Sequence, residues 1–600
     1  MGKFYSSILM IVPMLFWSSA IGQNNSKWNN TFYSERGIVD SIGQFEKQFE
    51  DYRTELKYAY DGGAEDYLFL DGKVVIRFND RSLYQKSESE KAARAERKKS
   101  PFESLEEWQE FERAGNRVVI EHEDITIRWD NANPNATIEP IEKTTFFKSY
   151  SWYENGKMVN RNQVSCFRGI VYKNLYPNID LRYTLHPDGG MKYDLIAHPG
   201  ADLSQVSFTY SHPVTLANDG TLEVKTDHGS ILESVPVCYY SDNAGNTFVA
   251  GFTVDGNTVS FNVDNHDATK ELIIDPWIQT PAFPSNWDCV WECETDAAGN
   301  SYLIGGVMPL ELHKYNAAGA LQWTYNTPYD TTSWLGTFAT DDAGFSYVTQ
   351  GSTAEILCVN TAGALVWSNN SPGGLFTSTE FWNIAFNCDQ TKLVVGGAGG
   401  SIPPLPYIYD IDMASGNVLS SIQVHGSSIA GIPPNTQEVR AITATENNKY
   451  YYLSHDTIGY VNDDLTLCPG SGGQPFHVEN GGYDFGYKCE NWRYNNTGME
   501  AIAYYNGFIY THRGDQIDKR EFSTANIIAS APIPGGQYNN VFLGGNVVEN
   551  SGIIIDECGN IFVGATNGVV QFDENLNQLA TFATSFVVYD VDITSTGDLI

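Results

Sequence analysis

The fold is decided by a short stretch of sequence, Asp296-Ala297-Ala298-Gly299-Asn300-Ser301-Tyr302. Related stretches return at 341–347 and 556–562, each with aspartate first and glycine fourth. In such a turn the aspartate accepts hydrogen bonds from backbone N–H groups, and the glycine supplies the positive φ that a tight hairpin requires. The repetition therefore predicts the same hairpin at three places in the chain.

A second hairpin sequence follows each of these turns one strand later. Residues 313–323 are echoed by 358–367, and more weakly by 409–419 and 571–579. Weaker copies of the first turn lie at 387–395, 445–453, 505–510 and 594–597. A unit of four strands that returns about every 40 to 60 residues is typical of the blades of a β-propeller.

The repeats predict six complete blades and a partial seventh, which stops at Ile600 inside its second strand. Each blade exposes an apolar face that only its neighbours cover, so the ring has to close. Either residues after Pro276 complete the last sheet or the natural polypeptide continues beyond Ile600, and we favour the second interpretation. We expect seven or eight blades in the natural protein.

The composition of the 600 residues fits a folded, turn-rich β protein. The chain is 42% hydrophobic, 13% aromatic and 18% charged, with 54 glycines. It is too rich in core-forming residues for disorder and too poor in charge for a coiled coil. Its 37 Lys and Arg against 73 Asp and Glu give a net charge of −36. This field repels phosphate backbones and anionic lipids, which excludes nucleic acid as a partner.

The first 22 residues predict a signal peptide. Lys3 supplies a positive start, residues 8–17 an apolar centre, and Ala20-Ile21-Gly22 a small-residue cleavage site before Gln23. No later segment approaches 18 apolar residues in a row, so we expect no transmembrane segment in the mature chain. The predicted address is secretion or the outer cell surface.

Nine cysteines in an exported chain raise the question of disulfides, but their number is odd and their spacing irregular. Cys468 and Cys489 bracket a long glycine-rich loop and form the best candidate pair. Two interpretations are open: the two cysteines form a disulfide, or they are two buried free thiols. Cys289 and Cys293 lie four apart on one face of a predicted strand, too far apart to bond easily.

Residues 23–276 predict a β-rich N-terminal domain that resembles a sandwich. Its clearest strands are predicted at 67–70, 73–78, 179–185, 192–196, 206–210, 222–226, 248–254, 259–263 and 272–274. A capping box at Ser104, followed by Leu105, Trp108 and Phe111 at helical spacing, predicts one short helix over 104–114. The propeller then occupies 277–600, and the chain as a whole is predicted to be mainly all-β.

An ordered series of segments in this domain carries a resemblance to a known family. The series includes His198-Pro199-Gly200-Ala201-Asp202, together with residues 131–136, 172–183, 192–194 and 272–276. It resembles the N-terminal domain of unknown function found in secreted Bacteroidota proteins, and the later repeats resemble secreted bacterial seven-bladed propellers. The resemblance implies a substrate of the type IX secretion system, whose C-terminal sorting domain is not in this sequence. It implies no catalytic residues.

Three aspartates of the resembling segments, Asp180, Asp194 and Asp202, invite a metal or catalytic interpretation. We favour a structural one, in which they accept backbone N–H groups in turns.

The chain lacks the standard catalytic signatures, but four acids deserve comparison. They lie shortly before a first turn, at or near the start of an innermost strand: Asp288, Glu380, Glu438 and Glu500. Three interpretations are open. The acids bond backbone N–H groups around the channel, which we favour; or all four hold Ca²⁺; or Glu380, Glu438 and Glu500 serve as acid and base in glycoside hydrolysis or polysaccharide elimination.

Two long segments between blades, 425–437 and 468–499, are candidate binding loops because long loops on a rigid scaffold concentrate function. The second presents aromatic side chains among glycine and asparagine: Phe476, Tyr483, Phe485, Tyr487, Trp492 and Tyr494. These rings suit sugar stacking or protein contact, and equally a small core within the loop.

The sequence thus favours a non-enzymatic interaction or adhesion module that binds an extracellular protein or glycan and carries no cofactor. The alternative is an extracellular propeller enzyme that uses the channel carboxylates. Quinone-dependent redox chemistry is a third possibility, because such enzymes also use propellers that carry tryptophan. Here the tryptophans end outer strands, which favours packing between blades.

Overall fold

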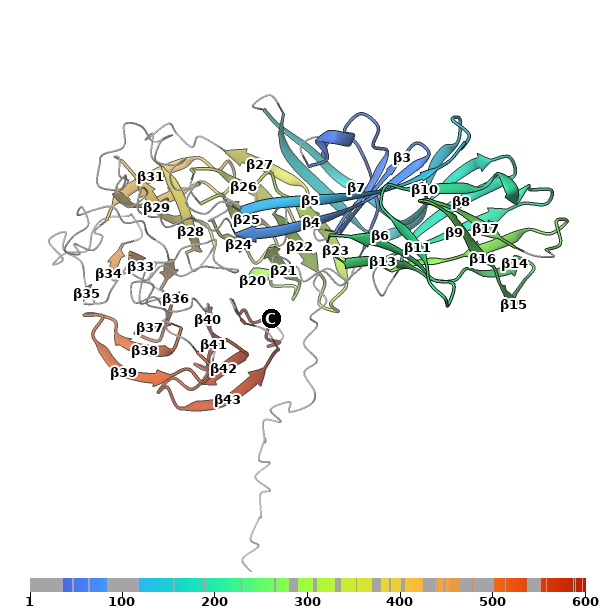
Figure 1. Cartoon of the computed structure of the whole chain (residues 1–600). Helices are drawn as coiled ribbons and strands as arrows, with labels where there is room; N and C mark the ends of the chain where they lie inside the picture. Colours follow the sequence, from blue (N-terminus) through green and yellow to red (C-terminus); the bar gives the residue numbers. More distant parts are fainter. Residues whose placement is uncertain are drawn as a thin grey trace, which may run out of the picture. The chain divides into compact units, whose positions relative to one another are not determined.

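Strands make up nearly all of the regular structure of the chain (Figure 1). The computed structural model describes residues 36–600 apart from 46–47, 63–64, 84–117, 155–156, 187–189, 228, 264–265, 280–289, 306–309, 330–335, 352, 370–378, 388–389, 401–404, 425–438, 440, 446–448, 455–456, 463–476, 479–500, 513, 537–551, 557, 586, 589 and 596. Within that part the helical elements are two 3-10 turns, η1 (Glu50–Tyr52) and η2 (Leu203–Gln205), and no helix is long and apolar enough to cross a membrane. The all-β class is confirmed. The predicted helix at 104–114 lies outside the described residues.

The N-terminal domain contains an eight-stranded sheet with the order β1-β2-β3-β4-β5-β10-β17-β16. Its strands are β1 (Val39–Asp40), β2 (Tyr58–Asp61), β3 (Glu65–Leu70), β4 (Lys73–Leu83), β5 (Val118–Trp129), β10 (Ser207–Tyr210), β17 (Thr258–Asn262) and β16 (Gly251–Asp255). All of its pairings are antiparallel.

A second sheet faces the first, with the order β11-β12-β13-β19-β9-β8-β7-β6 and a branch through β18, β14 and β15. Its strands are β6 (Thr137–Glu154), β7 (Lys157–Tyr176), β8 (Ile179–Leu185), β9 (Met191–Ala197), β11 (Val214–Leu216), β12 (Leu222–Thr226), β13 (Gly229–Glu233), β14 (Val237–Tyr240), β15 (Asn243–Val249), β18 (Leu272–Asp275) and β19 (Trp277–Gln279). One buried cluster takes residues from both sheets, including Trp129 and Phe208 from the first and Tyr183 and Tyr193 from the second. The domain is therefore a β-sandwich.

Most of the predicted strands of this domain are observed, and prediction and structure differ at two places. The predicted strand at 248–254 is divided at Ala250 into β15 and β16, which pair in different sheets. The hairpin of β6 and β7 contains the longest strands and was not predicted as such. Much of its surface is exposed or half-buried, so it lacks the alternating apolar pattern by which a strand is recognised.

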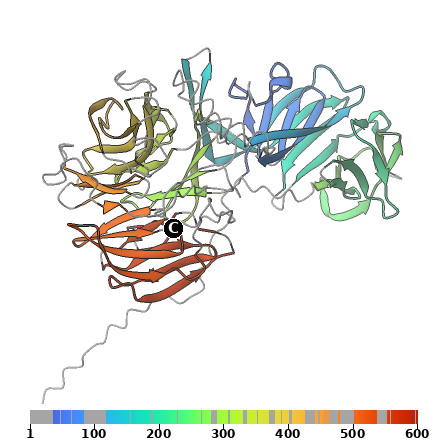
Figure 2. The same cartoon turned by 60° about the vertical axis from the view of Figure 1, so that its left-hand side comes forward.

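The second half of the described chain contains six successive sets of four antiparallel strands. They are β20 (Val290–Thr295), β21 (Ser301–Gly305), β22 (Glu311–Tyr315) and β23 (Leu321–Asn326) in blade 1; β24 (Phe338–Thr340), β25 (Ser346–Thr349), β26 (Ile356–Val359) and β27 (Leu365–Asn369) in blade 2; β28 (Glu380–Phe386), β29 (Leu393–Gly399), β30 (Leu405–Ile411) and β31 (Val418–Gln423) in blade 3; β32 (Ala441–Ala444), β33 (Tyr450–Ser454), β34 (Thr457–Val461) and β35 (His477–Val478) in blade 4; β36 (Ala501–Tyr505), β37 (Phe508–His512), β38 (Gln516–Glu521) and β39 (Ile527–Pro532) in blade 5; and β40 (Ile553–Ile555), β41 (Ile561–Ala565), β42 (Gly568–Phe572) and β43 (Gln578–Ala583) in blade 6. Figure 2 shows the later blades as successive twisted sheets.

Residues 588–600 lie between blade 6 and blade 1. The N–H of Val588 donates to the carbonyl of Ala565 at 3.0 Å, and the N–H of Cys293 donates to Asp590 Oδ2 at 3.1 Å. Asp592 and Ile600 exchange backbone hydrogen bonds, so this segment forms a short hairpin. The predicted partial seventh blade is therefore present, and it connects the two ends of the ring.

The repeated turns have the predicted chemistry. Asp296 Oδ1 accepts from the N–H groups of Ala298 and Asn300 at 3.0 and 2.9 Å, and the corresponding Asp556 does the same for Cys558 and Asn560. Gly299 has a φ of 76°. One side-chain carboxylate thus closes each of these hairpins.

Tryptophans at the outer strands join neighbouring blades. The indole N–H of Trp323 donates to the carbonyl of Thr361 in the second hairpin of blade 2 at 3.1 Å, and that of Trp367 donates to Met413 in blade 3 at 3.0 Å. The tryptophans therefore pack between blades, as the sequence predicts.

Candidate functional site

Carboxylates of blade 1 and of the partial blade lie at the junctions between neighbouring blades. From blade 1, Glu292 accepts from the hydroxyl of Thr337 and from the N–H of Phe338 in blade 2, the latter at 3.0 Å. Asp590 of the partial blade accepts from Cys293 of blade 1 in the same way. Each carboxylate therefore satisfies backbone or hydroxyl donors of the next blade.

Burial changes the titration of two further acids at this junction, Glu294 and Asp592, and repulsion by neighbouring carboxylates adds to the effect at Glu294. Burial, together with the carboxylates of Asp592 and Asp590, raises the pKa of Glu294 well above its usual value. Burial also raises the pKa of Asp592. The cluster therefore holds fewer negative charges than its composition suggests. Among the residues that the structure describes, no three or more His, Cys, Asp or Glu are placed to hold a metal ion.

Glu380 is the one predicted acid that lies within the described residues. It begins β28, is 2% exposed, and its Oε2 accepts the indole N–H of Trp382 at 2.9 Å. Asp288, Glu438 and Glu500 lie outside the described residues, as do the loop aromatics Phe476, Tyr483, Phe485, Tyr487, Trp492 and Tyr494. The interpretations of those residues stay predictions.

The candidate disulfide also lies outside the described residues, because neither Cys468 nor Cys489 is among them. Elsewhere in the described chain the free thiols are those of Cys166, Cys238, Cys293, Cys358 and Cys558.

The aspartates of the resembling segments have different roles. Asp180 accepts the N–H of Asn174 at 2.7 Å, and Asp202 accepts that of Ser204 at 3.0 Å, as the turn interpretation predicts. Asp194 is instead 1% exposed and forms ion pairs with the side chains of Arg182 and Lys192 in the second sheet. Its role was misjudged because its charged partners lie on its own and a neighbouring strand rather than in a turn.

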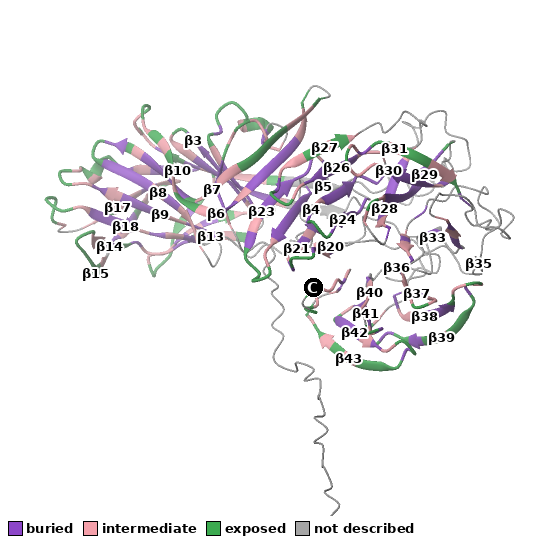
Figure 3. Cartoon of the chain, turned by 180° about the vertical axis from the view of Figure 1, so that it is seen from behind, coloured by how far each residue is buried: buried purple, intermediate pink, exposed green. Residues whose placement is uncertain are grey.

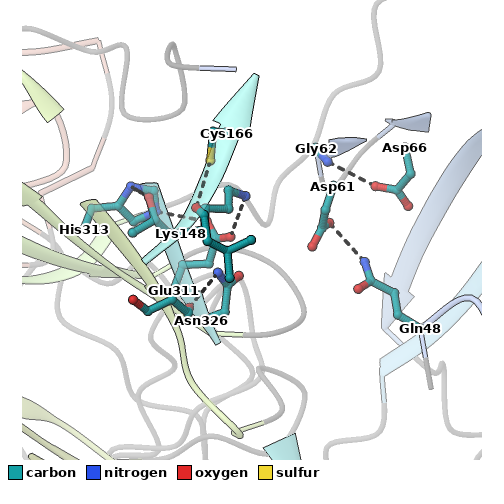
Figure 4. Close-up of polar contacts among 12 residues, drawn as sticks. Gln48, Asp61, Gly62, Asp66, Lys148, Cys166, Glu311, His313 and Asn326 are labelled. Atoms are coloured by element: carbon teal, nitrogen blue, oxygen red, sulfur yellow. Dashed lines mark hydrogen bonds and ion pairs between the residues drawn. The ribbon is translucent and has the colours of Figure 1, made fainter. Parts of the chain in front are cut away.

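A buried polar network joins the N-terminal domain to blade 1, and sequence reasoning missed it (Figure 4). The outer strand β23 pairs in parallel with β6, so the second sheet continues into the blade. Lys148 Nζ lies 3.4 Å from Glu311 Oε1, and His313 Nε2 lies 2.9 Å from Glu311 Oε2. The alternation of Glu311 and His313 in β22 places both on one face, but nothing in the sequence indicates that Lys148 lies opposite.

The charges of this network are strongly coupled. Burial opposes ionisation of Glu311, but the ammonium of Lys148 and the ring of His313 lower the pKa of Glu311 to about 2. Burial would likewise lower the pKa of Lys148, but the carboxylate of Glu311 raises it well above its usual value. The resting pair is therefore an ion pair.

The sheets define the class of this molecule as a β-sandwich domain followed by a β-propeller. Residues 41–277 match the family described as domain of unknown function DUF7948. No curated protein matches the chain.

Several solved structures are similar to the chain at low identity. BamB from Moraxella catarrhalis has a TM-score of 0.32 at 11% identity, covering 65% of this chain and 93% of that one. The WD40 repeats of RRP9 have a TM-score of 0.39 at 11% identity, covering 54% and 91%. A streptogramin B lyase has a TM-score of 0.38 at 9% identity, covering 53% and 91%.

Proposed function

We propose that this chain is an exported, non-enzymatic interaction module whose propeller presents loops to an extracellular protein or glycan. The signal sequence of residues 1–22 supports export, and the resemblance to secreted Bacteroidota proteins supports a place at the cell surface or outside it. The net charge of −36 disfavours nucleic acid and anionic membranes as partners.

One observation carries the non-enzymatic part of the proposal. A general acid or base has to come within hydrogen-bond distance of the substrate. Glu380 is 2% exposed and engaged by Trp382, while Glu292 and Asp590 bond the backbone of the next blade. These acids connect neighbouring parts of the scaffold. The long segments between blades are therefore the candidates for binding.

The binding half of the proposal is tested on a glycan array and on extracellular protein extracts, with residues 23–600 as the probe. We expect Trp492→Ala to weaken the best signal about tenfold or more, because buried aromatic anchors dominate interface energies. Leu579→Ala, at an exposed position on the outer strand of blade 6, is the control and should bind like the wild type. Equal binding by all three proteins would remove the loop from the proposal.

The non-enzymatic half is tested by incubating the same protein with neutral and acidic polysaccharides and measuring chain shortening. We expect none. Cleavage that is lost in Glu380→Gln, Glu438→Gln or Glu500→Gln would establish the enzyme alternative in place of this proposal. Export is tested separately, because the secreted chain should begin at Gln23.

A further inference from the structure

Three polar side chains share one face of three neighbouring strands at the junction (Figure 4). Glu311 on β22 is the register partner of Asn326 on β23, and Lys148 on β6 is the partner of Thr324. Lys148 and Asn326 are therefore diagonal neighbours, a separation of roughly 7 to 8 Å between backbones that long side chains span. Because the ammonium of Lys148 comes within 3.4 Å of Glu311, its side chain reaches across the strand that carries Asn326.

All three side chains are removed from solvent. Lys148 is 7% exposed, Glu311 4% and Asn326 1%. Asn326 Nδ2 donates to the carbonyl of Ser149 at 3.2 Å, which fixes the amide, while its Oδ1 is buried and has no hydrogen-bond partner among the described residues. A buried carbonyl oxygen that lacks a donor costs free energy and requires an explanation.

We propose that Lys148 and Asn326 become joined by an intramolecular isopeptide bond after the chain has folded, with Glu311 as the proton carrier. The bond forms between Lys148 Nζ and Asn326 Cγ, the bond from Cγ to Nδ2 breaks, and one molecule of ammonia leaves. Nothing is oxidised or reduced, and no co-reactant is needed.

The proton transfers follow from the contacts. Glu311 Oε1 takes a proton from the ammonium of Lys148, which leaves a neutral amine beside a neutral carboxylic acid. The acid donates its hydrogen bond to the unpartnered Asn326 Oδ1 and polarises the carbonyl for attack by the amine. Glu311 then moves a proton from the attacking nitrogen to Nδ2, and the bond from Cγ to Nδ2 breaks. The departing ammonia takes up the proton that Glu311 first received from Lys148 and leaves as ammonium, so Glu311 returns to the carboxylate.

The surroundings support this assignment. His313 holds the second oxygen of Glu311 at 2.9 Å, which fixes the direction of the reactive oxygen. Tyr150 and Cys166 are buried beside the network within the core cluster shared by the two domains, so water is excluded. The charged pair is the resting state, and its conversion to the neutral pair is one proton transfer. A reaction that occurs once per molecule tolerates a rare neutral form.

The consequence is a covalent connection between the N-terminal domain and the propeller, made by strands that lie far apart in the sequence. It would resist forced separation of the domains by more than the hydrogen bonds of β6 and β23 do. This inference does not depend on the proposed function.

The test is the mass of the purified full chain after reduction of its cysteines. We expect the wild type to be lighter than its sequence by one ammonia, and a digest to contain a branched peptide that joins the segments of Lys148 and Asn326. The peptide is decisive, because the Asn506-Gly507 pair can lose ammonia by local cyclisation. Wild-type protein with separate peptides for the two segments overturns the proposal.

Variants assign the roles of the three residues. Lys148→Arg keeps the charge but removes the nucleophile, and Glu311→Gln removes the proton carrier, so both should show the full sequence mass at this site. Lys314→Arg is the matched control, since Lys314 lies on the opposite face of β22 and donates to Thr361, and its branched peptide should form as in the wild type. Formation of the branched peptide in Glu311→Gln at the wild-type rate would overturn the role of Glu311.

Discussion

The two halves of the molecule bury their apolar residues in different ways. The sandwich has one large cluster between its sheets, to which nearly every strand of the domain contributes, and a smaller cluster that it shares with blade 1 through Leu321. The propeller has a succession of smaller clusters, and each is shared by two neighbouring blades, as in the set formed by Tyr347, Phe381 and Tyr409 across blades 2 and 3. A propeller blade therefore has no core of its own, whereas the sandwich does.

This difference in core organisation indicates how far the effect of a destabilising substitution should spread. A defect in the sandwich reaches one cooperative unit, while a defect between two blades reaches those two blades first. The exposed outer strands fit the same picture, since Figure 3 shows exposed colour along β39 and β43 and buried colour on inner strands. The edge of blade 1 is the exception, because β6 covers β23.

The largest expected effect comes from truncation inside the sandwich core. Trp129 is 2% exposed, donates to the hydroxyl of Tyr183 at 3.0 Å and packs on Phe208. We expect Trp129→Ala to lower the free energy of unfolding by about 3 to 5 kcal/mol. Hydrogen exchange should accelerate across both sheets of the domain.

The comparison for this prediction is Trp367→Ala in blade 2, where the ring is half-buried and donates to Met413. Its faster exchange should be confined to blades 2 and 3. Uniform acceleration through the whole propeller would contradict the idea of cores shared by pairs of blades.

A buried acid gives the sandwich a pH dependence. Glu233 is 0% exposed, and its Oε2 accepts the hydroxyl of Tyr193 at 2.9 Å. Burial raises the pKa of Glu233 from 4.5 to about 8. Between these values the folded state keeps a proton that the unfolded state has released. The contribution to stability is therefore complete below pH about 4.5 and is lost as the pH rises to about 8.

The measurement is urea unfolding at several pH values for the wild type and Glu233→Gln. The difference between the two proteins should change by about 1.4 kcal/mol per pH unit at most in that window, with the variant gaining on the wild type as pH rises. Glu50→Gln, at an exposed position, is the control and should follow the wild type. Parallel curves for wild type and Glu233→Gln would refute the prediction.

Two glycines at the same position of the repeat separate the effect of a turn from that of a blade interface. Gly319 and Gly363 have φ of 76° and 70°, so alanine is strained at both. Within the described part of the chain, a Cβ at Gly319 meets nothing within 4 Å, whereas one at Gly363 lies 2.8 Å from the ring of Trp323. We expect Gly319→Ala to cost about 1 kcal/mol and Gly363→Ala about 2 to 3 kcal/mol. If thermal unfolding showed equal losses of stability in the two variants, the ring of Trp323 would move aside without a loss of free energy, which would contradict the prediction.

The sequence predicts the turns and blades well because their information is local. An aspartate four residues before the N–H group that donates to it, such as Asp296 before Asn300, is visible in any short window of the sequence. The contacts of Lys148 cannot be predicted from a short window, because its partner Glu311 belongs to another domain. The pairing of β6 with β23 has no short sequence motif either. Glu380 is an intermediate case. The sequence predicts its place at the start of β28, but it does not predict the hydrogen bond from the indole of Trp382.

The smallest expected effect lies at the outer edges of the later blades. Leu419 on β31 is 66% exposed, so Leu419→Lys removes little buried area and should change the free energy of unfolding by less than about 0.5 kcal/mol. Leu321→Lys on β23 is the matched change in blade 1, where the side chain is 7% exposed and belongs to the core cluster shared with the N-terminal domain. It buries a charge without a partner and should unfold at a clearly lower urea concentration. If both variants unfolded together with the wild type, β23 would be an open edge like the others, and the pairing with β6 would not hold in solution.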